Sequence, residues 1–260
     1  MRWIKLGRLY SPESSHPKLA THASNPVAVL REGNIYRVFF SGRDSMNRSS
    51  VGFVDIDIVE RRALDPNRTP VFEYGSGNSF YADGVSLGNC YEVDGRRYLL
   101  FMGWRRSTDG HWQGTIGRLV LKSDFSLYLD DENPLMSSDA SDPVSLSYPW
   151  VIRHEDRSYS MWYGSTITWD AGNGEMLHPI KCARSNDGRH WQRKGVAVPY
   201  EIGVAQAFSR PSVIAGKQGY QMWFSYRGAP IGKYRIGYAI SSNGEDWSLR
   251  LNEAGIDAST

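Results

Sequence analysis

The chain has 260 residues, of which 40% are hydrophobic and 13% aromatic, and its formal net charge is +2. This length can bury a large core in one domain, and the near-neutral charge excludes the strong positive field of nucleic-acid or membrane-surface binders. No apolar run reaches the length of a membrane span, and the first residues lack the apolar core of a signal peptide. We therefore expect a cytoplasmic protein without nucleic-acid or membrane partners.

A segment that begins with Tyr and continues into aromatic and aliphatic residues occurs four times. The leading tyrosines are 62, 61 and 61 residues apart, at Tyr36, Tyr98, Tyr159 and Tyr220. Each copy mixes aromatic and β-branched residues over about seven positions, which favours a buried strand over a helix. Repeats of this length that contain only strands are typical of the four-stranded blades of a β-propeller.

An apolar stretch precedes each Tyr segment, and in three copies it begins with a proline, at Pro26, Pro149 and Pro211. Proline is tolerated at the first residue of a strand, so we predict that the first strand of these repeats starts there. Short polar turns at residues 31–34, 93–96, 154–157 and 216–219 predict hairpins between the first two strands. A third strand is predicted at residues 50–56, 114–120, 179–185 and 234–241.

Two of these third strands end in a similar turn, at residues 185–191 and 241–247. Each turn contains an Asp-Gly or Asn-Gly pair, which readily adopts the positive φ of a tight turn, and each ends in Trp. We interpret both turns as structural, with the Trp packing back on the outer strand.

The repeats predict a single β-propeller domain over residues 1–260, with four-stranded antiparallel blades. The four repeats cover about residues 20–65, 80–125, 142–191 and 205–247, and residues 2–10 are expected to form a closing strand. Propellers close by pairing their chain ends, because an open edge invites aggregation. Two alternatives stay open: the ring closes at four blades, or a fifth blade is incomplete, absent or supplied by another chain.

Six motifs extend this pattern over nearly the whole chain: His22-Ala-Ser-Asn-Pro26, Tyr36-Arg-Val-Phe-Phe-Ser-Gly-Arg-Asp44, Tyr81-Ala-Asp-Gly-Val85, Met161-Trp-Tyr-Gly-Ser165, Ser209-Arg-Pro211 and Tyr234-Arg-Ile-Gly-Tyr-Ala239. With them the chain resembles the five-bladed β-propeller glycosidase superfamily, which includes arabinanases, invertases and mannoside phosphorylases. It is most similar to glycosidase-like propellers encoded in bacterial surface-polysaccharide clusters. The resemblance implies a carbohydrate substrate and a site in the central channel.

In a propeller the innermost strand of each blade lines the channel, so residues near strand entrances are the candidates for a site. Asp83 and His22 are the candidate catalytic residues. The candidate substrate-binding residues are Asn25, Arg43, Asp44, Trp104, Arg105, Ser165, His178, Arg210, Arg227, Tyr234 and Arg235.

Glycoside hydrolysis ordinarily uses two carboxyl groups that flank the scissile bond. The resemblance implies an Asp on the first blade, an Asp on the second and a Glu on the third. Asp83 matches the second-blade position, whereas the first-blade position holds His22 or Asn25, and repeat three offers Asp142 and no Glu. A histidine at this position is a candidate general base, since an imidazole titrates near neutrality. The alternative is structural: Asp83 caps a turn before Gly84, and His22 is a hydrogen-bonded loop residue.

Arginines take the place of the missing acids, at corresponding edges of different repeats. Guanidinium groups suit the bidentate recognition of carboxylate or phosphate, so this set favours an acidic sugar, a sugar phosphate or a nucleotide-linked sugar. The alternative is that each arginine pairs with a nearby acid, as Arg43 would with Asp44, and ties loops together. Neither the histidines nor Cys90 and Cys182 show metal-ligand spacing, so we expect no metal, no cofactor and two free thiols.

Three functions follow from these residues. The first is a glycosidase-like, carbohydrate-active enzyme acting on an anionic sugar or glycan. The second is a transferase that uses a nucleotide- or phosphate-linked sugar in surface-polysaccharide biosynthesis, with His22 as base. The third is a non-catalytic propeller that binds a glycan or a protein. The sequence indicates no oligomeric state.

Overall fold

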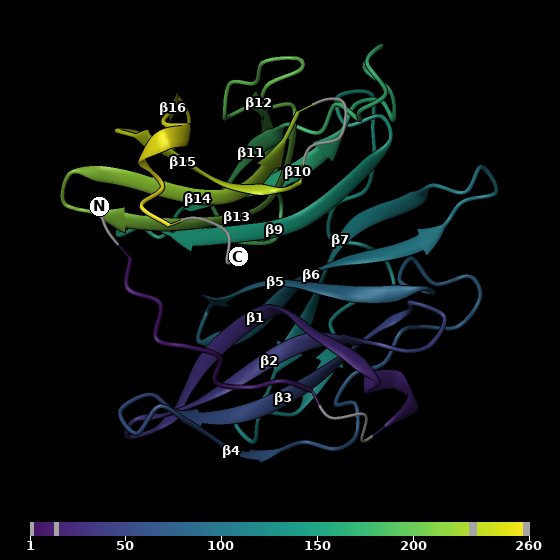
Figure 1. Ribbon diagram of the computed structural model, residues 1–260, viewed down its shortest axis with the longest axis vertical. Helices are drawn as coiled ribbons and strands as arrows, with labels where there is room; N and C mark the ends of the chain where they lie inside the picture. Colours follow the sequence, from purple (N-terminus) through teal and green to yellow (C-terminus); the bar gives the residue numbers. More distant parts are fainter. Residues whose placement is uncertain (1–2, 13–15, 229–232, 257–260) are drawn as a thin grey trace. The chain divides into compact units, whose positions relative to one another are not determined.

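The computed structural model describes residues 3–12, 16–228 and 233–256 (Figure 1). The chain divides into two compact units, an N-terminal unit of Lys5–Leu135 and a C-terminal unit of Met136–Thr260 together with Met1–Ile4. Both units consist of strands, apart from the 3-10 helices η1 (Pro17–Leu19) and η2 (Leu251–Glu253) in the described residues. The predicted all-β class, with antiparallel strands in groups of four, is confirmed.

The N-terminal unit contains two such groups of strands. A single parallel pairing, of Ser49 with Gly84, joins them into one eight-stranded sheet. Val51, Leu99 and Phe101 are fully buried in the apolar cluster between these groups. The strands are β1 (Thr21–Glu32), β2 (Ile35–Arg43), β3 (Ser49–Asp57), β4 (Arg62–Pro66), β5 (Gly84–Val93), β6 (Arg96–Arg106), β7 (Trp112–Leu121) and β8 (Leu127–Leu129).

The C-terminal unit contains two separate four-stranded sheets. Their first strands lie next to each other, and Trp162, Phe208 and Met222 form part of the apolar cluster between the sheets. One sheet consists of β9 (Ser145–Arg153), β10 (Tyr159–Thr166), β11 (Ile180–Ser185) and β12 (Gln192–Val196). The other consists of β13 (Ala207–Gly216), β14 (Gly219–Arg227), β15 (Arg235–Ser241) and β16 (Ser248–Leu249).

The predicted Tyr strands and hairpins are confirmed. The four Tyr segments are β2, β6, β10 and β14, and each pairs with the strand before it through a short turn. The two Gly-containing turns have the expected geometry, because Gly188 has φ 68° and Gly244 has φ 76°. Trp247 is buried, and its Nε1 donates to Gly244 O of its own turn at 3.0 Å.

The prediction that proline begins the first strands is wrong. These strands start four or five residues earlier, and each proline lies within its strand at a β-bulge. Two residues of the first strand there oppose one residue of the second: Asn25-Pro26, Tyr148-Pro149 and Arg210-Pro211. A bulge locally interrupts the ladder, so the missing N–H of proline leaves no unpaired partner. The same shift occurs in β5, between Leu87 and Cys90.

The closing strand predicted at residues 2–10 is not found over residues 3–10, which have no regular secondary structure. Trp3 is instead held by single contacts within the C-terminal unit. Its backbone N–H donates to Gly255 O at 3.1 Å, and its ring lies edge-on to Trp223 with centroids 5.5 Å apart. A side-chain anchor therefore replaces strand pairing here.

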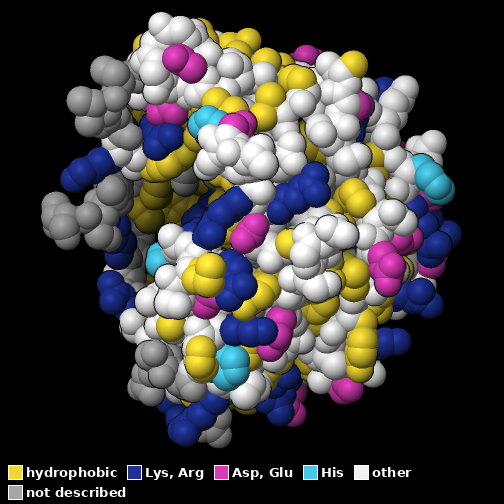
Figure 2. All heavy atoms as spheres, turned by 90° about the vertical axis from the view of Figure 1, so that its right-hand side faces the viewer, with side chains coloured by type: hydrophobic (Ala, Val, Ile, Leu, Met, Phe, Trp, Pro, Cys, Tyr) yellow, Lys and Arg dark blue, Asp and Glu magenta, His cyan; other side chains and the backbone are white. Residues whose placement is uncertain are grey.

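Charges of both signs are mixed on the surface. Figure 2 shows Lys and Arg side chains beside Asp and Glu side chains on the face in view. Many are paired, as Arg37 Nε is with Asp55 Oδ1 at 2.8 Å. The mixture agrees with the small net charge. None of the helices in the described part of the chain has the length and apolar character to cross a bilayer.

Candidate functional site

The structure divides the predicted site residues between the two units. The N-terminal unit carries His22, Asn25, Arg43, Asp44, Asp83, Trp104 and Arg105. The C-terminal unit carries Ser165, His178, Arg210, Arg227, Tyr234 and Arg235. Each set is described within its own unit.

In the C-terminal unit, the neighbouring first strands β9 and β13 bring Tyr148 and Arg210 together. Both residues occupy the bulge of their strand and have positive φ, 42° for Tyr148 and 57° for Arg210. The Arg210 guanidinium lies over the Tyr148 ring, with its Cζ 5.1 Å from the ring centroid. Among the residues that the structure describes, no carboxylate pairs with Arg210, which is exposed. Its charge is therefore open to an external anion.

Arg227, at the end of β14, lies within electrostatic range of the same group. Its Nη2 donates to Glu175 Oε1 at 2.9 Å, and its Nε lies 2.7 Å from Oε2. Its Cζ is 4.8 Å from the centroid of the Tyr234 ring, and the Tyr234 hydroxyl interacts electrostatically with Arg227, Arg210 and Tyr148. Tyr148, Glu175, Arg210, Arg227 and Tyr234 are called the arginine cluster below. It combines two guanidinium groups with one carboxylate and two aromatic rings.

Gln206 fastens the loop that carries Glu175. This side chain is fully buried and its Nε2 donates to the backbone oxygens of Glu175 and Met176, at 3.2 Å in each case. Its Oε1 accepts from Asn173 Nδ2 at 2.8 Å and from Gly203 N–H at 2.6 Å. A saturated amide of this kind holds two loops in fixed geometry.

Two predicted binding residues of this unit are buried and engaged elsewhere. Ser165 is fully buried, and its hydroxyl donates to Asp142 Oδ1 at 2.5 Å. Burial opposes the ionisation of Asp142, but the hydrogen bond from Ser165 and the nearby Lys181 hold its pKa below the ordinary value. His178 is also buried, so neither Ser165 nor His178 faces the arginine cluster's solvent side. Arg235 is exposed at the start of β15.

In the N-terminal unit, Asp83 lies directly before β5. Its Oδ2 accepts the backbone N–H of Arg106 at 2.8 Å, which orients the carboxylate without neutralising it. Trp104 packs across the start of β5, where a Cβ on Gly84 would lie 2.4 Å from Trp104 Nε1. Position 84 therefore requires glycine, because a side chain there would clash with the Trp104 ring. Trp104 Nε1 donates to Ser49 Oγ at 3.1 Å.

The other polar residues of this unit are mostly paired. Asp44 is buried; its Oδ2 binds Arg48 Nε at 2.8 Å. Although burial opposes ionisation, hydrogen bonds from Arg48 keep the pKa of Asp44 below its ordinary value. Arg43 does not pair with Asp44 as the structural alternative supposed, since its Nη1 donates to Asn47 Oδ1 at 3.2 Å. Arg105 is exposed and donates to Gln113 Oε1.

His22 and Asn25 lie at the beginning of β1, and both have positive φ, 63° and 54°. His22 is exposed, with its Nδ1 2.9 Å from Thr21 Oγ1. Asn25 is 9% exposed, and its Oδ1 accepts no hydrogen bond from the residues that the structure describes. A buried acceptor without a donor is costly, so this amide oxygen suits a donor from water or a ligand.

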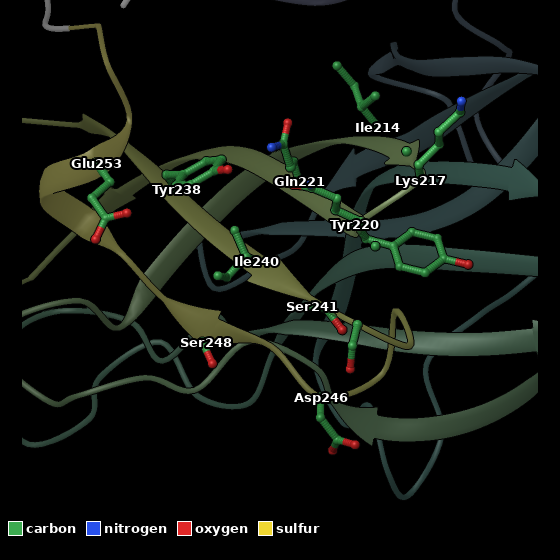
Figure 3. Close-up of a pocket in the computed structure, with 14 residues that line it drawn as sticks. Ile214, Lys217, Tyr220, Gln221, Tyr238, Ile240, Ser241, Asp246, Ser248 and Glu253 are labelled. Atoms are coloured by element: carbon green, nitrogen blue, oxygen red, sulfur yellow. The ribbon is translucent and has the colours of Figure 1, made fainter. Parts of the chain in front are cut away.

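A groove of about 960 Å³ is lined by residues of the β13–β16 sheet and of the segments next to it (Figure 3). None of the predicted site residues lines it. Its lining includes Ile214, Lys217, Tyr220, Gln221, Tyr238, Ile240, Ser241, Asp246, Ser248 and Glu253. The groove has no cluster of like charges, so the arginine cluster, and not this groove, is the candidate site.

Glu175 and Gln206 were not predicted from the sequence. Each is distant in the chain from the residues that it serves, since Glu175 and Arg227 are 52 residues apart. The sequence indicates the loop that carries Glu175 but not its partner, because Gly172-Asn-Gly-Glu175 contains the residues of a tight turn. In the described part of the chain, no three His, Cys, Asp or Glu residues are grouped as metal ligands.

Two Mycobacterium tuberculosis proteins, "Uncharacterized protein MT1551" of strain CDC 1551 and "Uncharacterized protein Rv1502" of strain H37Rv, are similar to the chain over its full length. Each is 38% identical to it over 261 residues, which cover 100% of this chain and 86% of the relative. The chain belongs to their family. No protein-family model matches it.

Solved structures show which fold this family has. The sucrose-6-phosphate hydrolase of Lactobacillus gasseri matches with a TM-score of 0.68 at 14% identity, over 87% of this chain and 47% of that one. The chain thus spans about half the length of that hydrolase. The α-L-arabinanase of Cellvibrio cellulosa matches with a TM-score of 0.64 at 11% identity, over 92% and 81%. The fold is that of the glycosidase-like propellers, as the sequence motifs predicted.

Proposed function

We propose that this protein is a carbohydrate-active, glycosidase-like enzyme that binds an anionic sugar or glycan through the arginine cluster. The observation that carries the proposal is Arg210, an exposed guanidinium without a carboxylate partner in the described residues, placed over the Tyr148 ring. Arg227 adds a second guanidinium whose direction is set by Glu175. Carboxylate and phosphate groups are the ligands that such forks bind best.

Both the fold and one neighbour support a sugar substrate of this kind. Structures with the same fold include glycoside hydrolases, and one is a hydrolase of sucrose 6-phosphate, which is an anionic sugar. A fold hosts many chemistries, so the substrate class rests on the arginine cluster and not on the fold alone.

Within the N-terminal unit, Asp83 is the candidate catalytic carboxylate. Of the acids near the predicted positions, Asp44 pairs with Arg48, Asp142 with Lys181 and Glu175 with Arg227. The Asp83 carboxylate accepts a backbone N–H and forms no ion pair within 4 Å in the described residues. It is therefore not held by a cation, whereas the other three acids are.

Binding of methyl β-D-glucuronide, compared with neutral methyl β-D-glucoside, tests the anion site. Arg210→Ala is expected to weaken glucuronide binding about tenfold or more, because a charged hydrogen bond is lost. Arg250→Ala removes the same charge from the exposed edge of this unit and serves as the matched control. Equal effects of the two variants in titration calorimetry would reject the arginine cluster as the site.

A second candidate, a sugar transferase, is favoured because Asp83 alone, among the described acids near the predicted positions, has no cationic partner, whereas hydrolysis ordinarily needs two free carboxyl groups. Here His22 takes the proton of an acceptor hydroxyl, whose oxygen bonds to the anomeric carbon while the phosphate leaves with the electron pair of the broken bond. Product analysis separates the candidates: hydrolysis gives the free sugar, whereas transfer gives a new glycoside only when an acceptor is present. Asp83→Asn is expected to abolish hydrolysis and His22→Ala to abolish transfer, whereas a binding protein has no turnover to lose.

A further inference from the structure

An exposed apolar turn (residues 200–204) lies between β12 and β13 in the C-terminal unit. Tyr200, Ile202 and Val204 are 41%, 48% and 50% exposed. The turn is closed by backbone hydrogen bonds between Glu201 and Ala205, at 2.9 Å each way. These exposed apolar side chains are available to an apolar ligand.

This turn is adjacent to the arginine cluster. Gly228 follows Arg227, and a Cβ on it would lie 2.5 Å from Gly203 O and 2.6 Å from Val204 O. Gln206 connects this turn to the end of β14. Its backbone N–H donates to Arg227 O at 3.1 Å, and its side-chain Oε1 accepts from Gly203 N–H. The turn and the backbone of Arg227 are therefore held in one fixed arrangement.

We infer that the arginine cluster accepts an anionic glycolipid, with the charged sugar head at Arg210 and Arg227 and the apolar chain along Ile202 and Val204. This inference rests on the proposed function and deepens it by naming the substrate class. The head group and the chain are complementary to the two adjoining surfaces, one cationic and one apolar. A free sugar would contact the cationic surface and would not need the apolar one.

The charges of the turn argue against a bare anionic membrane as its partner. Over residues 196–206 the only ionisable side chains are those of Tyr200 and Glu201. Surfaces that bind anionic lipid carry Lys or Arg among their apolar residues. A carboxylate at this place would be repelled by such a membrane, whereas it does not hinder a single alkyl chain.

Three probes test the inference: dodecyl β-D-glucuronide below its micellar concentration, methyl β-D-glucuronide, and the neutral dodecyl β-D-maltoside. We expect the dodecyl glucuronide to bind about tenfold more tightly than the methyl glucuronide, because part of its chain is buried. Ile202→Ser is expected to weaken dodecyl glucuronide binding about threefold and to leave methyl glucuronide binding unchanged. Ile214→Ser is the matched control, since Ile214 is 53% exposed in the same unit and lies away from the cluster.

The outcomes separate this inference from the proposed function. Equal affinities for both glucuronides, or equal effects of the two Ile variants, overturn the inference, and Arg210-dependent binding of methyl glucuronide leaves the proposed function standing. Equally tight binding of dodecyl maltoside overturns the inference as well, because it shows a general affinity for alkyl chains or membranes. Failure of both glucuronides to bind rejects the anionic-sugar function and the inference with it.

Discussion

His178 shows at the residue scale how burial decides the role of a titratable side chain. Its Nε2 lies 2.7 Å from Ser147 Oγ and its Nδ1 lies 2.7 Å from Thr166 Oγ1, and the imidazole is 3% exposed. Burial lowers the pKa of His178 to about 4. The imidazole is thus neutral at physiological pH and joins β9, β10 and the entrance of β11. We interpret it as a structural residue.

The pKa of His178 predicts a loss of stability in acid. Between pH 6.5 and about 4 the unfolded chain binds a proton that the folded chain does not, so the free energy of unfolding falls as the pH falls. The full contribution is about 3 kcal/mol, from 1.36 kcal/mol per pKa unit. Urea unfolding at pH 7 and pH 4.5 measures it.

In His178→Gln this part of the pH dependence should disappear. His154, whose pKa is also lowered by burial and by Arg184, stays in both proteins and contributes equally to each. The same decline of stability in the wild type and the variant would contradict the assignment.

At the scale of elements, the recurring bulge in the first strands is the main feature. The residue before each proline there has positive φ, at Asn25, Tyr148 and Arg210. Positive φ is disfavoured for any L-residue, and a following proline restricts the backbone further. Each bulge therefore stores strain on the order of 1 kcal/mol. Asn25 and Arg210 are among the residues predicted for the site, and strain of this kind is concentrated at functional sites.

Replacing Arg210 by glycine should separate stability from binding. Glycine adopts positive φ without a steric cost, so Arg210→Gly is expected to be about 0.5–1 kcal/mol more stable than Arg210→Ala. Both variants lose the guanidinium and should lose glucuronide binding equally. Denaturant unfolding and titration calorimetry measure the two effects.

Ala215→Gly in the same strand is the control, because Ala215 has no positive φ and the change there should destabilise the protein. An Arg210→Gly variant that is less stable than Arg210→Ala would show that the bulge is not strained.

At the scale of the whole molecule, stability depends on how neighbouring sheets pack within each unit. In the C-terminal unit, Trp162 of β10 reaches the turn after β15: its Nε1 donates to Gly244 O at 2.9 Å. Its ring lies edge-on to Trp247 with centroids 5.8 Å apart. Trp162 is fully buried, so it connects the two sheets through both apolar contact and a hydrogen bond.

Trp162→Phe should lower the free energy of unfolding by about 2–3 kcal/mol, since a cavity forms and a buried carbonyl loses its donor. The equivalent change Trp191→Phe is the control. The Nε1 of Trp191 has no hydrogen-bond partner in the described residues, so little is lost there. Similar destabilisation by the two variants in denaturant unfolding would argue against the hydrogen bond of Trp162.

Some of the site was predictable and some was not. Arg210, Arg227 and Tyr234 were proposed from their places beside strand ends, and the structure brings them together in the C-terminal unit. Ser165 was proposed in the same way, yet its side chain turns into the buried ion-pair group around Asp142. A position next to a strand end predicts where the backbone runs, but the partner that captures the side chain comes from elsewhere in the chain.

The strands can be read from the sequence alone, because alternation of apolar residues and β-propensity act over a few neighbouring residues. The sequence located β2, β6, β10 and β14 to within two residues at each end, and the turns between paired strands. Three features follow from tertiary contacts: the prolines lie in bulges, residues 3–10 form no strand, and Glu175 is the partner of Arg227. These features depend on pairing between residues far apart in the chain, and local residue patterns carry no information about such pairs.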